Sequence, residues 1–443
     1  MKQSLLLISI LSPGLWGQAT KPLTILHTND LHARFLPNDR QLGGFAQVAT
    51  VLRRERAGCG HCLTLDAGDL VQGSPVSTMF RGLPVYEVAN AFGFDASTLG
   101  NHEFDYGWQR VKDFERTAKF PLLNSNVVDL RGRTLLKRAW LRKKVGGVRV
   151  GIMGVLMDDL TKNFVAPDKL EPYHTIAKLD AVRRYAKKLE KTCDLLIVLA
   201  HISPKDAEAI LRQVPEIDLV INGHDHSGQK AIVEVTEGRL HPGYVVRSIG
   251  YGVEVGRLDL EVDVAGKYIA RQRWQKLAVD ANILAPAPDV AQLVGGWESR
   301  VAERVEAVIG EAKRGFLTKA ELQTLVERAL AQQMGVDLVY YNLGGLRDVL
   351  KAGPIRERAI WNILPFDNMM VSGKFKGSQL PAVIRNGRTI DPDREYTFAV
   401  TDFTASTEGA PGRPDSWGLT FPALGAPMRD LLIDWIKKTK IIE

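Results

Sequence analysis

The chain of 443 residues lacks three features. Beyond its first residues no stretch approaches the ~20 apolar residues of a membrane-spanning helix, no run of five or more like charges occurs, and no segment is repeated or of low complexity. The net charge of +7 is spread along the chain between acidic residues, so we expect no nucleic-acid partner and no membrane span. A mildly cationic surface of this kind favours anionic small molecules.

Cysteine is scarce, with three residues in all. Cys59 and Cys62 have the spacing of a redox dithiol, but they lead into a predicted strand instead of opening a helix, so we expect a local disulfide or two idle thiols. Cys193 lies beside a predicted buried strand and is expected in the core. No second cysteine pair exists, which argues against a thiolate zinc site.

The amino terminus has the pattern of a secretory signal. Lys2 precedes an apolar stretch from Leu5 to Leu15, and Gly17-Gln18-Ala19 offers small residues at the usual cleavage spacing. We therefore predict a signal peptide over residues 1–19 and an exported protein, periplasmic or secreted; the alternative is an anchoring or unstructured amino terminus. The charged carboxyl end, residues 435–440, argues against a lipid-anchor tail.

The 45% hydrophobic content and the length allow two domains, each with its own core. Strand and helix patterns alternate over residues 23–221, and residues 253–262 alternate with period two, as expected for extended strands of a second sheet. After a proline-containing break at 285–288, apolar residues at helical spacing from Val290 to Val308 predict a connecting helix, capped by Asp289 and ended by Gly310. We thus predict an α/β protein with a first domain over 20–284, a linker helix over 285–310 and a smaller α/β domain over 311–443.

Clusters of acid, amide and imidazole side chains follow the predicted strands of the first domain. Because ligands bind outside the carboxyl ends of strands in α/β sheets, clusters far apart in sequence can converge on one point. Asp30 and His32 can share one ion only if the strand end curls. The set is Asp30, His32, Asp69, Asn101, His201, His224 and His226.

These residue types suit a site with two divalent cations. The two oxygens of a carboxylate such as Asp69 can bridge cations roughly 3.5–4 Å apart. His226 would join Asp30 and His32 on one ion, and Asn101 would join the two remaining imidazoles, His201 and His224, on the other. Nitrogen and oxygen ligands suit zinc, manganese, iron or cobalt, and we expect zinc or manganese.

The ordered motifs resemble those of the calcineurin-like metallophosphoesterases. Two of them, His27-Thr28-Asn29-Asp30-Leu31-His32 and Gly100-Asn101-His102-Glu103-Phe104-Asp105, are similar to the exported 5′-nucleotidase and UDP-sugar hydrolase family. Residues 342–347 (Asn-Leu-Gly-Gly-Leu-Arg) and 364–366 (Leu-Pro-Phe) look like substrate-domain motifs of that family. The resemblance implies a four-layer α-β-β-α metallophosphoesterase sandwich followed by a 5′-nucleotidase C-terminal domain.

The resemblance also implies roles for individual residues. It places the metal ligands at the seven positions named above and a catalytic pair at His102 and Asp105, which would stabilise phosphate charge or assist the leaving oxygen while water acidified by the two cations attacks phosphorus. In the second domain, Arg347 would bind phosphate, Asn342 would bind a base edge or sugar hydroxyl, and Phe366 and Phe403 would stack on a base.

Two segments depart from the family pattern. After Phe403 the chain reads Thr-Ala-Ser-Thr-Glu-Gly where relatives have Gly-Gly-Asp, so the acidic residue expected to fix a base or ribose is shifted or lost. Residues 317–330 lack the Leu-Gly-Asn stretch expected there, and with it a clear second substrate arginine. Metal chemistry is therefore better defined by the sequence than nucleotide specificity.

Three hypotheses remain open. The first is a hydrolase that releases phosphate from nucleoside 5′-monophosphates or related phosphate esters. The second keeps the metal site but changes the substrate to a cyclic nucleotide, a nucleotide sugar or a sulfur ester. The third is a non-catalytic nucleotide- or metal-binding protein, which the presence of the His102–Asp105 pair disfavours.

Overall fold

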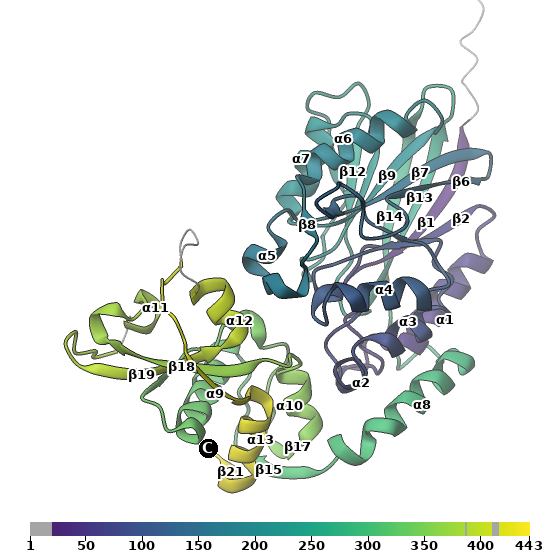
Figure 1. Ribbon diagram of the computed structural model, residues 1–443. Coiled ribbons are helices and arrows are strands. Elements are labelled where there is room, and N and C mark those ends of the chain that lie inside the picture. Colours follow the sequence, from purple (N-terminus) through teal and green to yellow (C-terminus); the bar gives the residue numbers. More distant parts are fainter. Residues whose placement is uncertain (1–19, 386–387, 410–415) are drawn as a thin grey trace, which may run out of the picture.

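The computed structural model describes residues 20–385, 388–409 and 416–443; the predicted signal peptide lies outside them. The protein has two α/β domains, the first a sandwich of two six-stranded mixed sheets (Figure 1). The first sheet has the order β14 (Tyr268–Ala278), β13 (Glu254–Asp263), β1 (Lys21–Thr28), β2 (Cys62–Asp66), β3 (Ala96–Thr98), β4 (Leu122–Leu123). The second has the order β11 (Val233–Val235), β12 (Gly243–Val246), β10 (Leu219–Asn222), β9 (Leu195–His201), β7 (Val148–Leu156), β6 (Trp140–Val145).

The inner faces of the two sheets form one apolar layer. Leu23 and Ile25 of β1 pack in the same cluster as Ile197 and Leu199 of β9, whereas Leu26 faces the outer helices. This alternation follows from the period-two geometry of a strand. Helix α1 (Phe45–Ala57) contacts the outer side of the first sheet, and helices α6 (Lys178–Leu189) and α7 (Pro204–Gln213) contact the second, which confirms the predicted four layers.

One sheet assignment from the sequence is wrong. Residues 254–262 of the alternating segment belong to β13, which pairs antiparallel with β1 from Lys21↔Val262 to His27↔Gly256 and so extends the first sheet. Period two reports that a strand is half-buried, but it carries no information about the partner strand. The second sheet is built instead from β6, β7 and β9 to β12, in the middle of the first domain.

The predicted linker helix is shorter than expected. Helix α8 (Pro288–Val305) begins after Ala287, and Asp289 pairs with Arg53 at 2.6 Å instead of capping the helix. The helix ends at Val305, before the predicted end at Gly310. Val308 lies instead in strand β15 (Val308–Ala312), which pairs with β17 (Gly353–Arg356). Val290, Val294, Val301 and Val305 are buried in the core of the first domain. Figure 1 shows α8 running beneath that domain toward the second.

The second domain has two small sheets. Strands β17, β15 and β21 (Ile441–Ile442) form one, and β16 (Leu338–Val339), β19 (Glu395–Thr401), β18 (Met369–Lys376) and β20 (Ala423–Pro427) form the other. Helix α9 (Lys319–Met334) starts at a capping box between Thr318 and Glu321 and ends at Gly335 in the left-handed region. Helices α9, α10 (Glu357–Ile363) and α13 (Met428–Thr439) contribute to its separate core.

The cysteine pair is bridged. Cys59 and Cys62 form a disulfide at the turn between α1 and β2, and Cys193 is a free buried thiol in the first-domain core. Among the described residues, no helix has the length and apolar character needed to cross a membrane.

Candidate metal centre and active site

The seven predicted ligands lie at or just beyond the carboxyl ends of five strands. Asp30 and His32 follow β1, Asp69 follows β2 and Asn101 follows β3 in the first sheet. His201 is the last residue of β9, and His224 and His226 follow β10, in the second sheet. The convergence of ligands therefore uses both sheets of the sandwich, and not the edge of one open sheet.

Several of these residues have left-handed backbone conformations. The φ angles are 52° at Asp30, 47° at His32, 54° at Asp69 and 77° at His224. For residues other than glycine, each such conformation costs on the order of 1–3 kcal/mol, and it persists only where the surrounding structure holds it. This is the curl that Asp30 and His32 need to face the same point.

Four donor atoms, one each from Asp30, His32, Asp69 and His226, lie within 4.8 Å of one another. The Nε2 atoms of His32 and His226 are 2.9 Å apart, and His226 Nε2 is 3.5 Å from Asp30 Oδ1. Asp30 and Asp69 are buried, and within the described ranges no lysine or arginine forms an ion pair with either. Buried carboxylates without a cationic partner are costly, so the cluster is suited to a metal cation.

One oxygen of Asp69 lies near two of the candidate histidine ligands. Its Oδ2 lies 3.8 Å from His32 Nε2 on one side and 3.1 Å from His201 Nε2 on the other, while Oδ1 accepts a hydrogen bond from the His102 backbone N–H at 2.9 Å. A Cβ on Gly100 would overlap this carboxylate, which explains why glycine stands there. Oδ2 alone therefore faces both histidines, whereas each of the two carboxylate oxygens was expected to face one cation.

His201 Nε2 faces the Asp69 carboxylate, with 3.1 Å between Nε2 and Oδ2. Its Nδ1 donates to the Ala67 carbonyl at 2.8 Å, so in the neutral ring Nε2 faces Oδ2 with no proton between them. Burial alone would lower the pKa of His201, but Asp69 and then Asp30 outweigh it and raise the pKa to about 10. The two carboxylates thus favour a positive charge beside His201 Nε2, and a divalent cation would supply one.

Burial favours the neutral form of the other three imidazoles, which is the form in which histidine binds a metal. Burial lowers the pKa of His224 to about 4 and that of His226 to about 3, and it holds the pKa of His32 well below its ordinary value. His224 Nδ1 lies 3.2 Å from Asn101 Oδ1, so both atoms are close enough to coordinate the same ion. These imidazoles, the Asn101 amide oxygen and the buried carboxylates form a donor set suited to divalent metal binding.

The predicted catalytic pair is in contact. His102 Nδ1 and Asp105 Oδ2 are 2.9 Å apart on the short 3₁₀ turn η1 (His102–Phe104). Burial would lower the pKa of His102, but Asp105 and then Asp69 outweigh it and raise the pKa. A nearby carboxylate both orients the ring and favours its protonated form.

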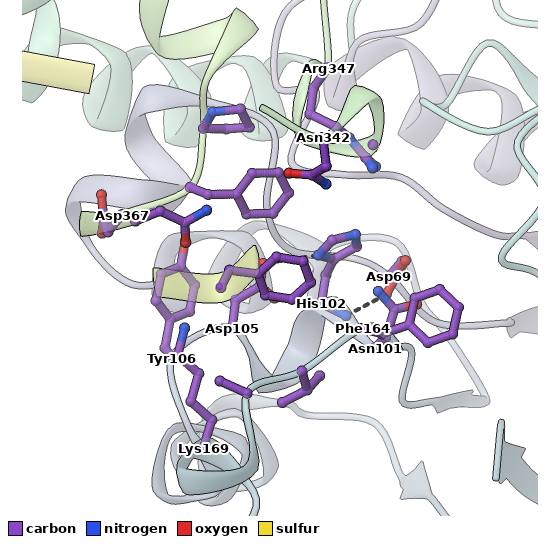
Figure 2. A pocket seen from close by; sticks show the side chains of 18 of the residues that line it. Asp69, Asn101, His102, Asp105, Tyr106, Phe164, Lys169, Asn342, Arg347 and Asp367 are labelled. Atoms are coloured by element: carbon purple, nitrogen blue, oxygen red, sulfur yellow. Dashed lines mark hydrogen bonds and ion pairs between the residues drawn. The ribbon is translucent and has the colours of Figure 1, made fainter. Parts of the chain in front are cut away.

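A pocket joins this centre to the second domain (Figure 2). All four predicted substrate residues line it, and the Phe366 ring lies 5.6 Å from the His102 ring at 31°. Asn342 and Arg347 point toward His102 from the second domain. Several lining residues were not expected from the sequence; they are Tyr106, Phe164, Lys169, Asp367 and Asn368. Asp367 and Asn368 directly follow Phe366, and Tyr106 directly follows Asp105, so adjacency to a predicted site residue could have revealed these three.

Arg429 of α13 holds the loop that carries Phe366. Its buried guanidinium donates to the carbonyls of Leu364 and Phe366, both at 2.8 Å, and pairs with Asp367 at 3.0 Å. From the first domain, the Thr78 hydroxyl donates to the Pro365 carbonyl at 3.0 Å. The loop is therefore fixed from both domains, which orients the Phe366 ring beside the metal centre.

Asp402 and Glu408 do not replace the missing acidic residue in this conformation. Asp402 Oδ1 accepts from the backbone N–H of Phe403 at 2.8 Å, and neither residue is among the pocket-lining residues in the described part of the chain. The pocket thus offers aromatic faces and cationic groups, together with Asp367, next to the metal centre.

Comparisons with known proteins agree with this geometry. Residues 23–228 match the calcineurin-like phosphoesterase family, and residues 305–387 match the 5′-nucleotidase C-terminal domain. The chain is 25% identical to endonuclease YhcR of Bacillus subtilis over 94% of its own length but only 40% of that protein's. It is 26% identical to the 5′-nucleotidase of Vibrio cholerae, with 86% of this chain and 81% of the relative covered.

Two solved structures share the whole fold. The 5′-nucleotidase precursor of Thermus thermophilus superposes with a TM-score of 0.84 at 22% identity, covering 95% of this chain and 97% of that one. The sulfate thiohydrolase SoxB of Thermus thermophilus superposes with a TM-score of 0.79 at 18% identity, covering 98% and 96%. With both domain families matched in order around one buried Asp/His centre, the chain belongs to the 5′-nucleotidase family of metallophosphoesterases.

Proposed function

We propose that the chain releases phosphate from nucleoside 5′-monophosphates or related phosphate esters. The observation that carries this proposal is the single pocket in which His102, Asp69, Arg347 and Phe366 meet. It brings a buried metal centre, a cationic group for a phosphoryl group and an aromatic face for a base within reach of one small molecule. The family implies a phosphate ester as substrate, and the V. cholerae relative is named a 5′-nucleotidase.

We assign Asp30, His32 and His226 to one divalent ion, Asn101, His201 and His224 to the other, and Asp69 to both, with zinc or manganese as the expected metal. When bound, the two ions would acidify water and neutralise phosphoryl charge. The imidazole and carboxylate donors of the cluster, without a thiolate, suit either metal.

The protein's own groups then orient the ester and supply a proton to the leaving oxygen. Arg347 offers a planar fork of N–H donors to phosphoryl oxygens, and Asn342 offers an amide to the sugar or base. His102, held by Asp105 through Nδ1, presents its other ring nitrogen for stabilising the phosphoryl charge or protonating the leaving oxygen. Phe366 and Phe403 exclude water from the base and stack on it.

The pocket predicts weak discrimination among bases. Because the acidic residue of Gly-Gly-Asp is missing after Phe403, and because Asp367, the acidic pocket residue beside Phe366, is paired with Arg429 at 3.0 Å, base and ribose lose a directed acceptor while phosphoryl recognition is kept. Values of kcat/KM for adenosine, guanosine, uridine and cytidine monophosphates should fall within roughly tenfold, or ~1.4 kcal/mol, of one another.

The same assay decides among the other candidate substrates. Phosphate or sulfate release is measured on the four monophosphates, a cyclic nucleotide, a nucleotide sugar, a sulfur ester and single-stranded DNA. A preference of about a thousandfold for one base would mean that another residue, Asp402 or Glu408 first, supplies the acceptor. Hydrolysis of another ester but no monophosphate would replace the proposed substrate, and binding without any hydrolysis would indicate a non-catalytic protein.

We also propose that the protein is exported to a periplasmic or extracellular space. The amino-terminal pattern of residues 1–19 motivates this, and the bridged Cys59–Cys62 pair suits an oxidising compartment. Fractionation of cells that express the full chain, with amino-terminal sequencing of the mature protein, tests it: cleavage near Ala19 is expected, and an uncleaved protein inside the cell would contradict it.

A further inference from the structure

Tyr251 is packed among the ligand loops, and nothing in the sequence pointed to it. Its backbone N–H donates to the Asp30 carbonyl at 2.6 Å, and that of Gly250 donates to the His226 carbonyl at 3.2 Å. Tyr251 has a φ of 63°, a left-handed conformation that is rare outside glycine and is held here by these contacts. The Gly250–Tyr251 turn therefore ties together two loops that carry ligands of one ion.

The Tyr251 side chain reaches one of these ligands directly. Its hydroxyl lies 2.9 Å from His226 Nδ1, while His226 Nε2 faces Asp30 and His32. If Nε2 is the ligating nitrogen, Nδ1 carries the hydrogen and donates it to the Tyr251 oxygen. An outer partner of this kind fixes the tautomer and ring orientation of a metal-ligating histidine.

Arg34 connects Tyr251 to the second domain. Its guanidinium lies 5.3 Å from the centre of the Tyr251 ring, within the range of a cation–π contact. On its other side, Arg34 Nη2 donates to the Arg347 carbonyl at 3.4 Å, and Nη1 lies 3.6 Å from Asp348 Oδ2. Arg347 in turn places its own Nη2 3.4 Å from His32 Nε2. The phosphate-binding segment of the second domain thus rests on a residue that also contacts Tyr251.

We propose that Tyr251 and Arg34 are positioning residues that join the metal ligand His226 to the Arg347–Asp348 segment. Tyr251 orients the His226 ring, and Arg34 holds Tyr251 and the Arg347 backbone in one arrangement. This inference rests on the proposed function, because it takes His226 as a ligand and Arg347 as the phosphoryl group's partner. Neither Tyr251 nor Arg34 needs to touch the substrate.

The first test is Co²⁺ binding by Tyr251→Phe, followed by the visible spectrum of the bound ion and by dialysis. Phenylalanine keeps the ring and removes only the acceptor, so affinity for one of the two ions should fall ~10–100-fold with a changed spectrum. Tyr185→Phe on α6, outside the site, is the matched control and should bind Co²⁺ as the wild type does. An unchanged affinity and spectrum in Tyr251→Phe would overturn the role of Tyr251.

The second test is calorimetric binding of inorganic phosphate to the Co²⁺-loaded protein. Arg34→Ala should weaken phosphate binding by at least about fivefold, a typical coupling between linked sites. The effect of Asp348→Asn should be smaller and should vanish in the Arg34→Ala background, since both act through the same contact. Equal phosphate affinity in wild type and Arg34→Ala would overturn the role of Arg34. A wild type that binds neither Co²⁺ nor phosphate would contradict the proposed function itself, whereas normal wild-type binding with unaffected variants would refute this inference alone.

Discussion

Replacing Asp69 with alanine is expected to remove at least one ion per chain and to lower turnover by ~10³-fold or more. One Asp69 oxygen faces ligands of both proposed ions, His32 at 3.8 Å and His201 at 3.1 Å. Without it, neither ion keeps a full set of donors, and the imidazoles lose the negative charge that draws a cation to them. Metal content by elemental analysis and phosphate release on the same sample measure both effects.

A control must separate the loss of a ligand from the cost of deleting a buried carboxylate. Asp218, before β10, is also buried and accepts a backbone hydrogen bond from Leu196 at 2.8 Å, but it is not among the proposed ligands. Asp218→Ala should lower the free energy of unfolding and retain the metal. If Asp69→Ala keeps both ions and its activity, the bridging assignment is wrong.

Replacing His102 with alanine is expected to cut turnover by ~10²-fold or more while both ions stay bound. The His102 side chain pairs with Asp105 and lines the pocket, and only its backbone N–H, which alanine retains, contacts Asp69. Turnover and metal stoichiometry are therefore separable in this variant, unlike in Asp69→Ala.

Asp105→Asn is a milder variant for comparison with His102→Ala. The amide keeps a polar group near His102 Nδ1 but removes the charge that favours the protonated ring, so its loss of turnover should be smaller than that of His102→Ala. A His102→Ala protein that loses its metals would instead place His102 in the ligand set. Full activity in that variant would remove it from the mechanism.

The convergence of the proposed ligands could be expected from the sequence because they follow short buried strands. The apolar runs 23–26, 63–65, 195–199 and 219–221 fall within β1, β2, β9 and β10, and the polar clusters come directly after them. A curl at Asp30 and His32 was required for both to reach one ion, but the left-handed backbones of Asp69 and His224 were not predicted, since tertiary contacts impose these conformations against local preference.

Contacts between distant segments explain the features that the sequence did not predict correctly. Residues 253–262 read as a strand, but only the long-range pairing with β1 shows which sheet they join. Val308 continues the helical spacing of α8 in the sequence, yet its pairing with β17 places it in a strand. Tyr251 meets His226 across 25 residues, and Arg34 meets Asp348 across the domain boundary, so no local pattern marks either residue.

The most direct test of metal-dependent phosphoester hydrolysis is removal and return of the metal. The purified protein is stripped with a chelator, and phosphate release from adenosine monophosphate is followed as Zn²⁺ or Mn²⁺ is added back in steps. We predict that activity is lost on stripping and returns in proportion to bound metal, reaching its maximum near two ions per chain. Hydrolysis that persists at full rate in the metal-free protein would contradict metal-dependent catalysis.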